Sequence, residues 1–216
     1  MSQDGLIEKE ESAELYVSGA SDPLNVMIDE KNALAQMPVN SDSVETQEIL
    51  PGATIVDMEG ISFLVLEKES EFHKTLNDKN GVEQKKAYVR KLLNIYGLDD
   101  KPASGVLALT RDDTRISMEP YVYVRDTGTL YYETACGSGT TAVGMLEAAN
   151  AGKSIQNLEI YQPSGKPISV TIEYDGKNYK SAAINGPVDI VFDGNMPLNN
   201  KADITPINDN ILRNEI

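Results

Sequence analysis

The stretch YYETACGSGTTAVGMLEAANAGK, residues 131 to 153, places the only cysteine of the chain, Cys136, directly before a predicted helix. Apolar residues wrap most of the way round this helix, about Gly139 to Ala149, which is typical of a helix buried in a core. The preceding residues 128 to 134, GTLYYET, read as a strand because aromatic residues favour strands. We therefore expect a strand that leads almost directly into a central, buried helix.

Most of the remaining chain shows strand patterns separated by turn residues. Helical periodicity occurs once more, after Gly81, and predicts a covering helix that ends at Gly97. Residues 40 to 48 are polar and aperiodic and are expected to form a linker. About ten strands against two helices predict an α+β fold, with a mostly antiparallel sheet curled round the central helix. The strands are expected within residues 13–39 (three strands), 52–68 (two strands), 104–111, 119–126, 128–134 and 157–193.

Composition and charge limit the classes of function. A chain of 216 residues fits one large domain or two small ones. Its net charge of -15, without a stripe of Lys and Arg, argues against binding to nucleic acid or to an anionic membrane surface. The first residues lack the pattern of a signal peptide, and no apolar run approaches the ~18 residues of a membrane span. A cytoplasmic enzyme or binding protein is the expected class.

Cys136 is the first candidate for chemistry. A single cysteine forms no disulfide within the chain, and no His/Cys spacing indicates a metal site. The N–H groups and partial positive charge at a helix N-terminus lower the pKa of a thiol. The N–H groups of Gly137, Ser138 and Gly139 could bind a substrate carboxylate there. Packing of a small buried residue explains the same pattern, and the sequence leaves both interpretations open.

Two stretches resemble a known family. The segments ETACGSGTTAVG and YQPSGKPISVTIEYDGKNYKSAAINGPVDIVFDG are similar to the C-terminal half of the diaminopimelate epimerase family, which contains cofactor-independent amino-acid racemases and epimerases. The similarity is strongest to the histidine racemase branch and extends over most of the chain, to about Gly194. It implies a diaminopimelate epimerase-like fold and an isomerase that needs neither pyridoxal phosphate nor a metal.

The resemblance also implies residue roles. In that family two cysteines face each other across the substrate α-carbon, and each exchanges a proton with it. Cys136 matches the second of them, and Gly137, Ser138 and Gly139 match the amides that hold the α-carboxylate. The expected substrate is a small α-amino acid, with histidine as the best specific interpretation and diaminopimelate as an alternative. A Glu-Arg pair that diaminopimelate epimerases carry before this cysteine is absent, which favours another amino acid.

The first cysteine motif of the family, Cys-Gly-Asn, is also absent. The resemblance therefore divides the chain into residues 1–50 as the remainder of an N-terminal domain, 51–195 as a C-terminal epimerase-like domain and 196–216 as a polar tail. A separate chain or an upstream segment would supply the other cysteine, and a homodimer is left open. The alternatives are a noncatalytic amino-acid-binding module and one half of a split enzyme.

Glu133 and His73 are two further candidates for a role in the site. Glu133 lies three residues before Cys136 and could accept a hydrogen bond from a substrate amine or imidazole, although such a residue can equally end a strand in solvent. His73 is the only histidine and lies in a charged segment without a second His or Cys nearby. A structural role is therefore expected for His73.

Overall fold

The computed structural model describes residues 12–17, 20, 22–28, 31–39 and 44–188. Within them the chain forms a mixed α+β fold with one large sheet and three helices. The helices are α1 (Glu71–Asn77), α2 (Val82–Ile95) and α3 (Gly137–Ala151). The strands are β1 (Ser12–Leu15), β2 (Leu24–Ile28), β3 (Asn32–Met37), β4 (Glu45–Leu50), β5 (Ala53–Met58), β6 (Ile61–Leu66), β7 (Ala103–Arg111), β8 (Ile116–Val124), β9 (Thr129–Tyr132), β10 (Ile155–Tyr161), β11 (Pro167–Tyr174) and β12 (Tyr179–Pro187).

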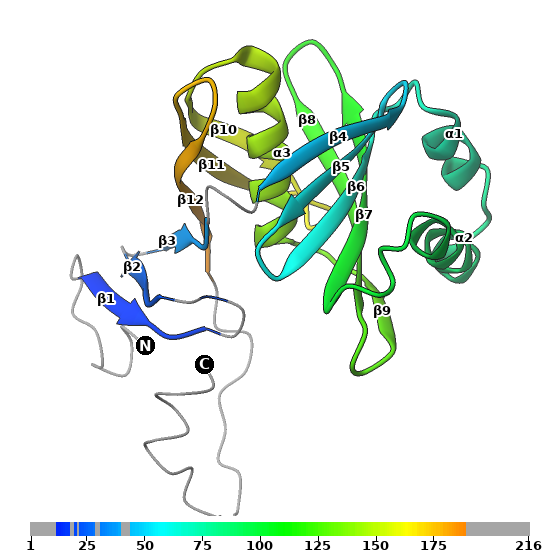
Figure 1. The fold of residues 1–216 in the computed structure, drawn as a ribbon, viewed down its shortest axis with the longest axis horizontal. Coiled ribbons are helices and arrows are strands. Elements are labelled where there is room, and N and C mark those ends of the chain that lie inside the picture. The colour runs from blue at the N-terminus through cyan, green and yellow to red at the C-terminus, as the bar shows by residue number, and fades with distance from the viewer. Residues whose placement is uncertain (1–11, 18–19, 21, 29–30, 40–43, 189–216) are drawn as a thin grey trace, which may run out of the picture.

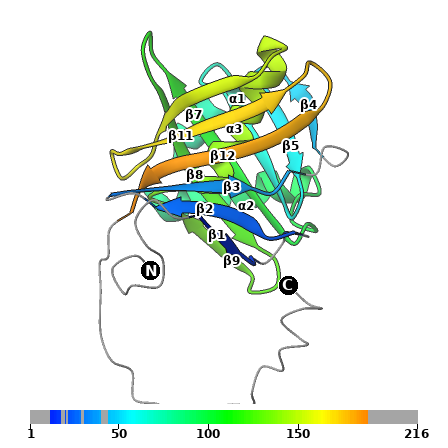
Figure 2. The ribbon, with the colours of Figure 1, turned by 90° about the vertical axis from the view of Figure 1, so that its left-hand side faces the viewer.

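The strands lie in the order β1-β2-β3-β12-β11-β10-β8-β7-β6-β5-β4, and β9 pairs with β8. The pairs β10–β8 and β6–β7 are parallel, and the other neighbours are antiparallel. Figure 2 shows β1, β2, β3, β12 and β11 side by side at one end of this sheet. Strands on either side of residue 50 thus share one sheet, and the division expected from the sequence stays a prediction.

Helix α3 is the inner helix. It packs against β10, β11 and β12 and also against β5 and β6, and Figure 1 shows it between these two parts of the sheet. Its residues Ala142, Val143 and Met145 are fully buried, which confirms the prediction of a helix without a polar face. The approach to the sheet is close at Gly144, where an added Cβ would lie 2.7 Å from Val170 Cγ1.

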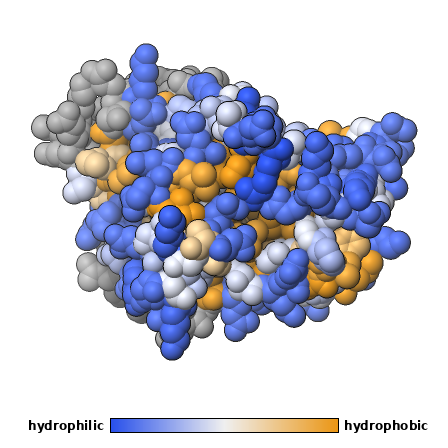
Figure 3. All heavy atoms as spheres, turned by 90° about the horizontal axis from the view of Figure 1, so that it is seen from above, coloured by the Kyte–Doolittle hydropathy of each residue, from blue (hydrophilic) through white to orange (hydrophobic). Residues whose placement is uncertain are grey.

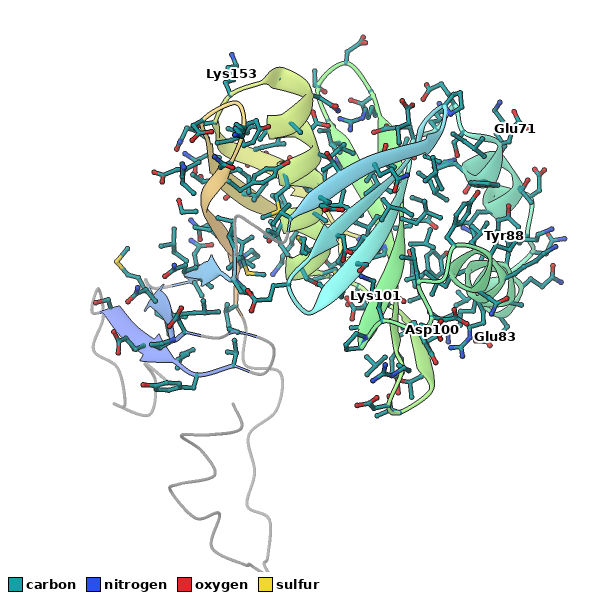
Figure 4. The ribbon with its side chains drawn as sticks, in the orientation of Figure 1. Glu71, Glu83, Tyr88, Asp100, Lys101 and Lys153 are labelled. Atoms are coloured by element: carbon teal, nitrogen blue, oxygen red, sulfur yellow. The ribbon has the colours of Figure 1, made fainter. Side chains whose placement is uncertain are left out.

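Helices α1 and α2 cover the opposite face of the sheet. Leu76 of α1 and Val89, Leu92 and Leu93 of α2 join a second core. Their charged side chains, such as Glu71 and Glu83, point away from the sheet (Figure 4). Strands β6 and β7 lie between the two cores, and their side chains alternate between them. The residues Phe63, Val65, Leu107 and Leu109 belong to the core around α3, while Leu64, Leu66, Val106 and Ala108 belong to the core under α2.

Two segments differ from the sequence-based prediction. Strand β4 covers residues 45 to 50, although residues 40 to 48 were expected to form a linker. Four of its six residues are exposed polar side chains, so this edge strand lacks the alternating pattern that usually identifies a strand. Helix α1 was missed because it is short and buries only His73 and Leu76. The last part of the predicted 157–193 strand region, residues 189 to 193, lies outside the described residues.

One face of the described part is mainly polar. Viewed from above, hydrophilic side chains cover most of the molecule, and apolar ones show between them (Figure 3). None of the three helices within the described ranges is long and apolar enough to cross a membrane.

Candidate active site at the N-terminus of helix α3

Cys136 is the N-cap of α3. Its backbone is extended, with φ -138° and ψ 105°, and its Sγ accepts a hydrogen bond from the N–H of Gly139 at 3.4 Å. Such a cap satisfies one of the N–H groups that the first turn of a helix leaves without an intrahelical partner. Ser138 Oγ lies 3.6 Å from the same sulfur. The thiol is therefore held against the first turn of the helix.

The backbone of Cys136 is fixed by a buried polar network. Its N–H donates to Gln162 Oε1 at 3.1 Å, and its carbonyl oxygen accepts from Thr140 Oγ1 at 2.8 Å. Gln162 Nε2 donates to Thr140 Oγ1 and to the carbonyl oxygen of Ile160. Gln162 and Thr140 were not singled out by the sequence analysis. Gln162 lies in the segment YQPSGKPISV that resembles the family, but nothing in one sequence shows that it reaches Cys136.

The thiol does not have the low pKa that its position at a helix N-terminus predicts. Cys136 is 4% exposed, and this burial raises the pKa of the thiol to about 12. The Glu133 carboxylate also raises the pKa of Cys136, through its charge and through a hydrogen bond. Hydrogen bonds from Ser138 and from the N–H of Gly139 lower the pKa, but they are outweighed. The expectation of a lowered pKa is therefore wrong for this structure, because desolvation exceeds the effect of the helix N-terminus.

A cavity of about 460 Å³ opens beside the first turn of α3. Ser138 is the one residue of α3 among its described lining residues, and the opposite wall is the apolar face of β1, β2 and β3. Leu15, Leu24, Val26 and Met37 contribute to this wall, and Glu59 and Gly60 of the β5–β6 turn close another side. Lys153 marks the far end of α3 in Figure 4, so the N-terminal end of the helix faces β1–β3.

The structure brings together all the site residues that the sequence suggested. Gly137, Ser138 and Gly139 form the first turn of α3, and Glu133 is half-buried just after β9, close enough to act on the thiol. The N–H groups of Gly139 and Thr140 bind Cys136 Sγ and the Cys136 carbonyl oxygen. In the described part of the chain, this leaves the N–H groups of Gly137 and Ser138 for a ligand.

His73 is buried within helix α1 and packs there. It is 3% exposed, and its Nδ1 lies 3.1 Å from Asn77 Nδ2 one turn along α1. Burial lowers the pKa of this imidazole. Across the described ranges, no group of three or more His, Cys, Asp or Glu side chains could hold a metal ion.

Comparisons with known proteins point to one family. Residues 1–196 match the family model described as the histidine racemase CntK N-terminal domain. Two histidine racemases of Fusobacterium nucleatum subsp. nucleatum strains are 39% identical over 83 residues and 35% identical over 96 residues, which is 38% and 44% of this chain. The matches cover 28% and 33% of those relatives, so the chain spans about a third of their length.

Among solved structures, the chain matches a phenazine biosynthesis protein of the PhzF family from Enterococcus faecalis. It is 18% identical, covers 91% of this chain and 68% of its own, and gives a TM-score of 0.48. The family model, in contrast, extends over nearly all of the described residues and includes Cys136 and its network. The chain therefore belongs to the histidine racemase CntK N-terminal domain family.

Proposed function

We propose that this chain is part of a cofactor-independent amino-acid racemase, with histidine as the substrate, and that Cys136 is one of its two proton-transfer groups. The proposal includes a diaminopimelate epimerase-like fold, in which the sheet curls round α3. The observation that carries it is the placement of Cys136 at the N-cap of the buried helix α3, beside a cavity of about 460 Å³. The family match and the histidine racemase relatives support the choice of substrate.

The first turn of α3 would bind the substrate carboxylate. The N–H groups of Gly137 and Ser138 point out of a helix N-terminus, which carries about half a positive charge. A carboxylate there would place the α-carbon near Ser138 and the sulfur behind it, 3.6 Å from Ser138 Oγ. The same amides would stabilise the negative charge that develops when the α-proton leaves.

The raised pKa of Cys136 favours the role of proton donor, because the thiol keeps its proton until the substrate takes it. A base on the other face of the substrate removes the α-proton, and the electron pair stays on the α-carbon and its carboxylate. The Cys136 S–H then gives its proton to the opposite face, which inverts the centre and leaves a thiolate. The N–H of Gly139 and Ser138 Oγ are placed to stabilise that thiolate. In the reverse direction the thiolate acts as the base.

The second group would come from a separate chain or from another part of a longer polypeptide, since Cys136 is the only cysteine of this sequence. The test is to incubate the chain with L-histidine in deuterated water and follow the α-proton by NMR. We expect no exchange by the chain alone, and exchange when a longer polypeptide that carries a second cysteine is supplied. Cys136→Ser should abolish the conversion of L-histidine to D-histidine by that longer polypeptide, because no group then delivers a proton to the opposite face. Robust racemisation by the isolated chain would contradict the proposal of two thiols.

A noncatalytic amino-acid-binding module is the second candidate, and the burial of Cys136 favours it. Both candidates predict that histidine shifts the NMR signals of the Gly137 and Ser138 amides. Cys136→Ser should leave histidine binding intact in both cases. Only for a racemase should it also remove an activity, the racemisation of histidine. Diaminopimelate and glutamate serve as comparison ligands, and a clear preference for glutamate would count against the histidine assignment.

A further inference from the structure

Gln162 connects Cys136 to a different part of the sheet. It follows β10 and begins the tight turn to β11, in which the N–H of Gly165 donates to the Gln162 carbonyl oxygen at 2.9 Å. Gly165 has φ +82°, a conformation that a three-residue hairpin loop requires and that glycine adopts without strain. The position of the Gln162 backbone is thus set by a hairpin and not by α3.

Both polar atoms of the Gln162 side chain form hydrogen bonds. It is 5% exposed, its Oε1 accepts from the Cys136 N–H, and its Nε2 donates to Thr140 Oγ1 and the Ile160 carbonyl oxygen. Thr140 Oγ1 in turn donates to the Cys136 carbonyl oxygen. Both backbone polar groups of Cys136 are therefore bound, directly or through Thr140, to a single amide. A second link joins the same turn to this segment, because the Ser164 N–H donates to the Thr134 carbonyl oxygen at 2.9 Å.

We infer that Gln162 is the positioning residue of the Cys136 thiol, an inference that rests on the proposed function of that thiol. The amide fixes the extended backbone of Cys136, and the extended backbone directs Sγ onto the Gly139 N–H and away from solvent. The hydrogen bonds of the Gln162 side chain go to the Cys136 N–H, Thr140 and Ile160, and not to the sulfur. It acts on the reaction by holding the proton donor at one position and in a dry environment.

Removal of the Gln162 acceptor oxygen should expose the Cys136 thiol to water. In Gln162→Leu the Cys136 N–H loses its partner, and we expect about tenfold faster amide exchange at Cys136, which corresponds to about 1.4 kcal/mol. The backbone there then opens to water, and hydration favours the thiolate. We expect the pH midpoint of iodoacetamide alkylation to fall by about one unit or more.

A variant that keeps the acceptor oxygen should retain protection of the Cys136 amide. Gln162→Glu keeps an acceptor oxygen for the Cys136 N–H but loses the Nε2 donor to Thr140 Oγ1 and the Ile160 carbonyl oxygen. The Cys136 amide should therefore exchange more slowly than in Gln162→Leu. The alkylation midpoint of Gln162→Glu should be at least as high as in the wild type, because a second carboxylate near the sulfur disfavours the thiolate. Gln162→Asn is too short to reach Cys136 and should resemble Gln162→Leu, which provides a second variant if the leucine does not fold.

Tyr179→Phe is the matched control. It removes one buried hydrogen bond to α3, from the Tyr179 hydroxyl to the Met145 carbonyl oxygen at 3.0 Å, far along the helix from Cys136. It should lower stability without moving the alkylation midpoint. If folded Gln162→Leu and Gln162→Asn retain the wild-type exchange rate and midpoint, the inference is wrong. If Tyr179→Phe shifts the midpoint equally, the effect is one of general stability and the inference is also wrong. These readouts need no substrate, so a failure to racemise histidine does not affect them.

Discussion

Helices α3 and α2 are nearly equal in length, with 15 and 14 residues, and lie on opposite faces of the same sheet. Helix α2 buries Val89, Leu92 and Leu93 and exposes most of its other residues, whereas α3 exposes little of its length. Their first residues differ as well. Helix α3 begins with a side-chain cap from Cys136, while the N-cap of α2, Gly81, makes no side-chain hydrogen bond.

The difference shows how packing determines what a helix end can do. An exposed N-terminus such as that of α2 is solvated, so its partial charge is screened and its N–H groups bind water. The N-terminus of α3 is held by strands and a hairpin, and its first N–H groups have fixed directions next to a cavity. The same burial removes water from Cys136 and raises its pKa. A buried helix end thus offers a precise anion site but makes a neighbouring thiol harder to ionise.

The largest expected effect tests how closely α3 approaches the sheet. Gly144→Val would place a Cβ 2.7 Å from Val170 Cγ1, and the rigid strand leaves little room for adjustment. We expect a loss of about 3 kcal/mol or more in the free energy of unfolding, measured by urea titration. Lys91→Val on the exposed face of α2 is the control and should cost less than about 1 kcal/mol. Equal losses would show that the two helices are packed alike.

The second effect concerns pH. The folded pKa of Cys136 is raised to about 12, whereas an unfolded cysteine titrates near ~8.5. The stabilising contribution of the neutral buried thiol is therefore complete below ~8.5 and is lost as the pH rises towards the folded value. Relative to Cys136→Ser, the wild type should lose up to about 1.4 kcal/mol of stability per pH unit above ~8.5. A parallel pH dependence of the two proteins would mean that the thiol is not desolvated.

A smaller effect is expected at the N-cap of α1 on the outer face. Ser70 is 2% exposed, and its Oγ accepts from the N–H of His73 at 3.1 Å. Ser70→Ala should cost about 1 kcal/mol in thermal or urea unfolding. Ser70→Thr retains the hydroxyl and should recover much of that loss. A change of less than a few tenths of a kcal/mol in Ser70→Ala would indicate that the outer helices do not depend on their caps.

The smallest effect is expected on the exposed side of α2. Glu83 and Lys86 form a pair one turn apart, with 3.2 Å between Glu83 Oε1 and Lys86 Nζ. Glu83→Gln should change the free energy of unfolding by less than about 0.5 kcal/mol, and 1 M salt should remove the difference. A loss above 1 kcal/mol that persists in high salt would contradict the view of α2 as a solvated covering helix.

The sequence predicted the elements whose burial follows a simple period. Helix α3 was identified because its apolar residues surround it, and β6 because Ile61 to Leu66 are nearly all apolar. Strand β4 and helix α1 were missed for the opposite reason. Each owes its structure to neighbours in the sheet or the core, and its own residues carry little of the pattern.

The sequence predicted which residues form the site but not the direction in which the pKa of Cys136 is shifted. The position of Cys136 next to Gly137, Ser138 and Gly139 follows from the sequence, and the structure gives it the same helix N-terminus. The pKa was predicted in the wrong direction, because a sequence does not show what packs over the sulfur. Gln162 is 26 residues from Cys136 in the chain, so its contact with the Cys136 N–H depends on the pairing of β10 with β8 and β11.

Strands β6 and β7 also carry a consequence for folding. Their neighbouring residues belong to different cores, as Val106 and Leu107 do, so a slip of one residue in the pairing would exchange the contents of both cores at once. Phe63 would then face the space that fits Leu64. A strand with one buried face can tolerate a misaligned partner more easily, because only one side is wrong. A shifted register between the parallel strands β6 and β7 is therefore strongly disfavoured. The correct register also fixes where α2 and α3 lie relative to each other.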